Sequence, residues 1–70
     1  MSVLYNALSG KGEVDVIDLY FAYFGDLEAD RRTAAQRLGP RITKLNRRLK
    51  NTDKMVRPGR QKYTYAIVTF

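Results

Sequence analysis

The residues of this chain with the most distinctive chemistry are basic, amide and hydroxyl side chains that recur through residues 36–62. On a helix over 36–51 with its apolar stripe facing inward, several of them share the outward face. Asn and Gln pair with adenine, Arg with guanine and Thr with a base edge or thymine methyl, while flanking Arg and Lys suit phosphates. The candidate binding residues are Gln36, Arg37, Arg41, Thr43, Lys44, Arg47, Arg48 and Asn51 on this helix, and Arg57, Arg60 and Lys62 in a following hairpin.

Charge is separated along the sequence. Residues 1–30 contain six of the seven acids and one base and sum to −5, whereas residues 31–70 contain twelve Lys and Arg with one acid and sum to +11. No acid lies between Arg31 and Thr52, so cations at helical spacing repel one another where an ordinary exposed helix alternates its signs. A positive face of this kind attracts polyanions. The pattern favours nucleic-acid binding over the alternative, a merely solvated helix surface.

Seventy residues with neither cysteine nor histidine limit the chemistry available to the chain. The length fits a single domain over residues 1–70. There is no thiolate nucleophile, no usual zinc site and no histidine general base, so we expect no enzymatic activity, no catalytic residue, no metal and no cofactor. Nothing in the composition points to a small-molecule ligand.

Secretion and membrane insertion are not expected either. The longest apolar stretch, residues 19–24, is too short to span a bilayer. The first residues lack the basic and apolar regions of a signal peptide. We therefore expect a cytoplasmic protein with no membrane partner, associated with a nucleoid or, if viral, located in the host cytoplasm.

Apolar residues at helical spacing predict a short helix near the N-terminus. It spans residues 2–9, has Ser2 as its N-cap and ends at Gly10. Residues 13–14 then leave room for a strand of only one or two residues. This part of the chain therefore supplies one helix and one very short strand.

A second helix is predicted directly after this strand. Asp15 is a good N-cap for it, and Gly25 ends it. Its residues are apolar around most of the circumference, which predicts a helix in the middle of a small core. Residues 26–30 follow as an acidic loop.

The most regular stretch of the sequence predicts a third helix over about residues 31–50. Its apolar residues are spaced at three or four from Ala34 to Leu49 and form one stripe. Gly39 and Pro40 interrupt the stretch, because proline removes a backbone donor and clashes with the preceding turn. The stretch is therefore either kinked or divided into helix, turn and helix.

The last part of the sequence predicts a two-stranded hairpin. Residues 55–57 and 63–70 are rich in β-branched and aromatic residues, and Pro58 and Gly59 join them. The connection is basic. Phe70 either fills the core or pairs with a second subunit.

This order of elements resembles a winged-helix domain, an α+β fold with three helices, one very short strand and a C-terminal two-stranded β-hairpin wing. The segments GEVDVIDLYFAYFG, ITKLNRRLK and RPGRQKYTYAIV are similar to the DNA-binding effector domains of OmpR/PhoB-type response regulators. The first matches an acid-capped helix that ends in an aromatic residue and Gly, the second a recognition helix, and the third a basic hairpin with a Tyr-x-apolar strand. The resemblance covers about residues 10–70. It implies that Arg41, Thr43, Lys44, Arg47 and Arg48 face the major groove and that Arg60 and Lys62 make the wing contact.

Two departures from that family matter. Its receiver domain has no counterpart here, so phosphorelay control is not implied. The segment DRRTAAQRLGP is longer than the family's connection. Within it, TAAQRLG resembles the first helix and turn of a generic helix-turn-helix, which places the reading helix at 41–50 in either case.

These observations predict a sequence-specific duplex DNA-binding protein, a small transcriptional regulator of the phage, virus or plasmid type. The helix at 41–50 would read the major groove, and the wing at 57–62 would contact the backbone or the minor groove. A domain of this size reads only a few base pairs, which favours a homodimer on DNA. The alternatives are an architectural or recombination accessory protein that bends DNA, an RNA-binding protein, or a protein-interaction module.

Overall fold

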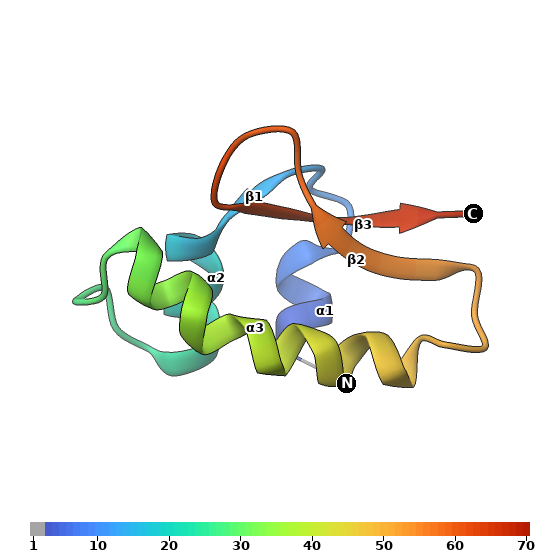
Figure 1. Cartoon of the computed structure of the whole chain (residues 1–70), viewed down its shortest axis with the longest axis horizontal. Helices are drawn as coiled ribbons and strands as arrows, with labels where there is room; N and C mark the ends of the chain where they lie inside the picture. The colour runs from blue at the N-terminus through green and yellow to red at the C-terminus, as the bar shows by residue number, and fades with distance from the viewer. Residues whose placement is uncertain (1–2) are drawn as a thin grey trace.

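Three helices lie beside a small antiparallel sheet (Figure 1) in the computed structural model, which describes residues 3–70. The expected α+β class, with one very short strand and a C-terminal hairpin, is confirmed. The Ser2 cap expected for the first helix lies outside the described residues. In chain order the elements are α1 (Val3–Leu8), β1 (Val14–Asp15), α2 (Val16–Phe24), α3 (Arg31–Arg48), β2 (Lys54–Pro58) and β3 (Thr64–Thr69).

The sheet has the strand order β1-β3-β2, and both strand pairs are antiparallel. Val14 pairs with Tyr65 on one side of β3, and Val56 pairs with Ile67 on the other. The backbone of Val56 also bonds to α3: its N–H donates to Asn46 Oδ1 at 2.7 Å, and Asn46 Nδ2 donates to its carbonyl at 3.0 Å. One amide side chain therefore ties the edge strand β2 to α3.

Two aspartates fix the starts of the two longer helices. Asp15 caps α2 by accepting a hydrogen bond from Ile17 N at 2.8 Å, and it also pairs with Arg31 Nε at 3.0 Å. Asp30 caps α3 by accepting from Thr33 N at 2.7 Å. These backbone hydrogen bonds hold the pKa of both carboxyls below the usual range. Acids from the first part of the sequence thus position the basic helix.

The core lies where the three helices meet the sheet. The apolar stripe predicted for the third helix is confirmed, because α3 buries residues spaced at four, four and three along one side. Thr64 of β3 is the buried polar residue among those described. The buried apolar side chains are Leu4 and Leu8 from α1, Val16, Leu19 and Tyr20 from α2, Ala34, Leu38, Ile42 and Leu45 from α3, and Val56 from β2.

The prediction that the second helix lies in the middle of the core is wrong. Only one side of α2 is buried, and Phe21 and Tyr23 are 52% and 40% exposed. Gly25 does end the helix, in the left-handed conformation with φ 84°. In a domain of this size α1 and α3 already cover the inner side of α2, so its remaining aromatic residues stay on the surface.

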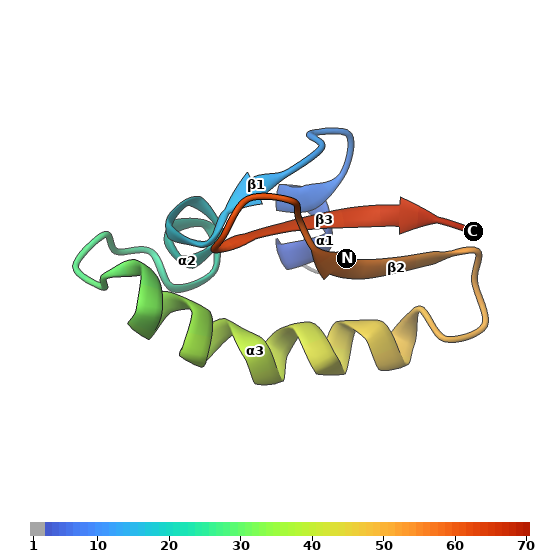
Figure 2. The same ribbon diagram turned by 45° about the horizontal axis from the view of Figure 1, so that its top comes forward.

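α3 passes through Gly39 and Pro40 without a break. Figure 2 shows it bowed, with its convex side away from the sheet. Leu38 and Ile42, on either side of Pro40, are both buried, so the apolar stripe keeps its register. Burial on both sides outweighs the cost of one lost backbone donor. Of the two alternatives for this stretch, the division into helix, turn and helix is therefore wrong, and residues 41–50 do not form a separate reading helix.

Two further features concern the surface. Phe70 is 79% exposed, so it does not fill the core. Within residues 3–70, none of the helices combines the length and the apolar character needed to cross a membrane.

Candidate nucleic-acid interface

All the candidate binding residues are exposed. Seven of them lie on α3, and three lie in or beside the β2–β3 connection. Asn51 was expected on the same helix, but α3 ends at Arg48 and residues 49–51 form a turn. The seven on the helix are Gln36, Arg37, Arg41, Thr43, Lys44, Arg47 and Arg48.

These seven side chains form two sets on α3. Spacings of four, three and four put one set along the flank of the helix, and we call it the cationic row: Arg37, Arg41, Lys44 and Arg48. The other set lies opposite the buried stripe, and we call it the outward face: Gln36, Thr43 and Arg47.

Aromatic residues of α2 hold the first half of the cationic row. Arg37 Nη1 donates a hydrogen bond to Tyr20 Oη at 2.8 Å. The guanidinium carbon of Arg41 lies 5.8 Å from the ring centroid of Tyr23, within the range of a cation–π contact. These contacts limit the freedom of two long side chains, which lowers the entropy that binding would cost.

The last three members of the cationic row line one wall of a shallow hollow of about 110 Å³ between the helices. The hollow has the size and charge to take one phosphate group, because cations on one wall suit an anion that keeps its outer oxygens in water. Within residues 3–70 the ion pairs involve Arg31 and Lys54, so no carboxylate neutralises this wall. The lining residues are Arg41, Lys44 and Arg48 with Leu4, Tyr23 and Leu45.

On the outward face, one predicted group is already engaged. Thr43 Oγ1 donates to the carbonyl of Gly39 at 3.1 Å, one turn back and next to Pro40. Arg32 belongs to this face as well, because it lies one turn before Gln36 and is exposed. Arg32 was not among the predicted residues because the outward face was considered over residues 36–51 only, although the third helix was predicted to begin near residue 31.

The tip of the β2–β3 hairpin is fixed by Glu13, which was not among the predicted site residues. Glu13 Oε1 accepts from Gln61 N at 3.0 Å and lies 3.1 Å from Thr64 Oγ1. The bond from the Gln61 backbone holds the Glu13 pKa below its usual range. A Cβ at Gly59 would clash with Thr64 Oγ1 and Glu13 Oε1, so the tip needs glycine there. This contact joins residues that are 48 apart in the sequence, so no local sequence pattern predicts it.

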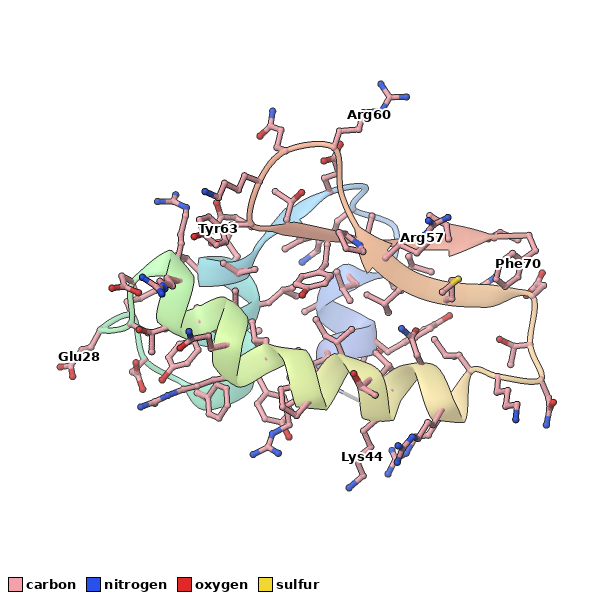
Figure 3. All side chains as sticks on the ribbon, in the orientation of Figure 1. Glu28, Lys44, Arg57, Arg60, Tyr63 and Phe70 are labelled. Atoms are coloured by element: carbon pink, nitrogen blue, oxygen red, sulfur yellow. The ribbon has the colours of Figure 1, made fainter. Side chains whose placement is uncertain are left out.

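The cationic row and the hairpin tip do not share one flat face. In Figure 3, Lys44 and Arg60 point toward opposite edges of the molecule, and Arg57 lies on β2 between them. A straight duplex laid against Lys44 would therefore lie far from Arg60.

In comparisons with known proteins, no family model, curated protein or solved structure matches this chain.

Proposed function

We propose that this chain is a winged-helix protein that binds duplex DNA in a sequence-specific manner and regulates transcription. α3 enters the major groove and makes the main contact. The observation that carries this proposal is the exposed, acid-free surface of α3, on which four cations follow one another along one flank. Like charges at this spacing destabilise an isolated helix, and a polyanion relieves their repulsion.

The order of elements supports the winged-helix assignment. A helix and a very short strand precede two helices and a hairpin, and the short strand pairs with the last strand of the chain. In this arrangement the reading helix is the whole of α3, and the loop at residues 25–30 is the turn of the helix-turn-helix. This longer helix brings Arg32 and Gln36 into the proposed reading surface.

The two sets on α3 have different proposed roles. Cations of the row bind phosphates and hold the register, because phosphate contacts carry no sequence information. Gln36 and Arg47 on the outward face read base edges, Gln pairing with adenine and Arg with guanine. Thr43 offers its methyl group to a thymine, since its hydroxyl already donates to Gly39.

Binding to random-sequence duplexes, measured by fluorescence anisotropy at two salt concentrations, tests the proposal, with a structured RNA alongside. Affinity for duplex should fall by orders of magnitude between ~50 and ~200 mM salt, as neutralising several phosphates requires. Sequencing the retained duplexes should give a site preferred by ~10³-fold or more over random sequence. Binding to RNA alone, or to neither polymer at low salt, would contradict the proposal.

DNA bending is the second candidate function, and the positions of Lys44 and Arg60 favour it. A duplex reaches both only if it curves around the molecule, because the two side chains point to opposite edges. Energy transfer between dyes on the two ends of a duplex separates the two functions. An architectural protein shortens the end-to-end distance of many sequences, whereas a regulator discriminates among them.

A further inference from the structure

The two ends of this molecule carry surfaces of opposite character. The molecule is 34 Å along its longest axis. The acidic loop between α2 and α3 lies at one end, and the end of α3, the start of β2 and Phe70 lie at the other (Figures 1 and 3). Residues 26–30 contain three carboxylates and no base. The acidic loop takes no part in the proposed contact with DNA, whereas Thr43 and Arg47 belong both to the outward face of α3 and to the surface at the other end.

The acidic loop presents one apolar side chain between two acids. Leu27 is 62% exposed, and Asp26 and Glu28 flank it in the sequence. Asp26 Oδ1 accepts a hydrogen bond from Glu28 N at 3.1 Å, and Asp30 caps α3 directly after the loop. In Figure 3, Glu28 points away from the body of the molecule. Because two side chains already brace the loop, docking it costs little further ordering.

The opposite end has an apolar groove with a basic rim. Its volume is about 350 Å³, and Leu49, Met55 and Phe70 line it. Arg47, Lys50 and Lys54 lie at the same groove and supply three positive charges. Lys54 also approaches Asp53, with 3.6 Å between Nζ and Oδ1, so one acid partly offsets this rim. The groove is therefore suited to an apolar side chain that arrives with acidic neighbours.

We propose that the acidic loop of one copy of this chain docks in the groove of the next copy, with Leu27 against Phe70 and Met55. The three acids of residues 26–30 meet the three bases of the rim, so the surfaces complement each other in charge and in apolar character. Each copy carries both surfaces at opposite ends, and the contact is therefore head-to-tail. Such a contact repeats from copy to copy and gives an open chain, or a ring where the rotation between copies closes. The inference does not rest on the proposed function and is tested without DNA.

Sedimentation velocity of the full chain at low salt gives the first test. The average mass should rise steadily between ~10 µM and ~1 mM protein, the affinity range of a small contact, and should fall when salt is added. Leu27→Asp and Lys50→Glu/Lys54→Glu should each remain monomeric. Val3→Asp and Lys11→Glu, which change the charge at exposed residues elsewhere, should assemble as the parent chain does. Circular dichroism checks that every variant keeps its fold.

Mixing the two assembly-deficient variants gives the sharper test. Leu27→Asp keeps an intact groove, and Lys50→Glu/Lys54→Glu keeps an intact loop, so an equimolar mixture has one usable contact and should form a dimer and nothing larger. A parent chain that stays monomeric over the whole range would overturn the inference. So would a closed dimer that Leu27→Asp leaves intact, or a mixture that contains monomers only.

Discussion

The side chain of Asn46 joins α3 to the edge strand β2 through two hydrogen bonds. It accepts from Val56 N at 2.7 Å and donates to Val56 O at 3.0 Å, in a partly buried position. Asn46→Ala leaves two backbone groups without these partners and should lower the free energy of unfolding by about 1–3 kcal/mol. Asn51→Ala removes the same amide from the exposed turn and should change it by less than about 0.5 kcal/mol. Urea denaturation measures both, and equal effects would contradict the role of Asn46.

Glu13 makes the hairpin tip sensitive to acid. Its pKa in the folded chain is lowered, chiefly by the Gln61 backbone bond, so its contribution to stability is complete above the unfolded-state pKa. That contribution is lost as the pH falls through the folded-state pKa, which lies below the ordinary glutamate value. The amide shift of Gln61, followed by NMR, should titrate there and should not do so in Glu13→Gln. Glu28→Gln is the control, and an unchanged titration in Glu13→Gln would disprove the contact.

At the scale of single residues, the sequence predicted which polar side chains are exposed better than it predicted their hydrogen-bond partners. Every candidate binding residue is exposed, as a polar pattern opposite an apolar stripe requires. Asn46 and Glu13 were missed because their partners are backbone groups distant in sequence, 10 and 48 residues away. Such contacts exist only after the sheet has packed on the helices.

At the scale of helices and strands, the continuity of α3 through Gly39 and Pro40 can be tested by substitution of Gly39. Gly39 has no positive φ, and a Cβ added there would meet nothing within 4 Å. Gly39→Ala should therefore raise the free energy of unfolding by roughly 0.5–1 kcal/mol, the usual gain for Ala over Gly inside a helix. Thermal or urea denaturation measures the change.

Gly25→Ala gives the matched comparison for this prediction. Gly25 has a φ of 84°, so an alanine there is strained and should lower stability. If Gly39 lay in a turn between two helices, its substitution would be destabilising in the same way. A loss of stability in Gly39→Ala would therefore contradict an unbroken helix.

The sequence predicted the order, type and approximate bounds of the elements. It did not predict that α3 continues through Gly39 and Pro40, or that one side of α2 is exposed. Local preference disfavours proline within a helix, yet the buried stripe from Ala34 to Leu45 runs through it. The apolar circumference of α2 indicated full burial, yet Phe21 remains half exposed. In both cases the packing of the whole domain, which no local window contains, decides the outcome.

At the scale of the whole molecule, folding brings some of the acids of the first part of the sequence next to bases of the second part, such as Asp15 next to Arg31. Acids cap the helix starts, fix the hairpin tip and occupy the α2–α3 loop, while the cations cover α3 and the hairpin. The stretch of α3 from Arg41 to Arg48 contains four bases and no acid. This acid-free run was predictable from the sequence, but the opposed directions of Lys44 and Arg60 were not, because they depend on how the hairpin folds over the sheet.

The most direct test of whether α3 is the DNA-binding surface compares two triple variants. Each variant's binding to a short duplex that holds one copy is measured at several salt concentrations. Arg41→Gln/Lys44→Gln/Arg48→Gln removes the three positive charges that line the hollow. Lys11→Gln/Lys50→Gln/Lys54→Gln removes three positive charges elsewhere. The first variant should lose most of its affinity and roughly three units of the salt slope, one for each phosphate contact. The second should bind nearly as the parent chain does. Equal losses in the two variants, or full affinity in the first, would contradict a DNA interface on this face of α3.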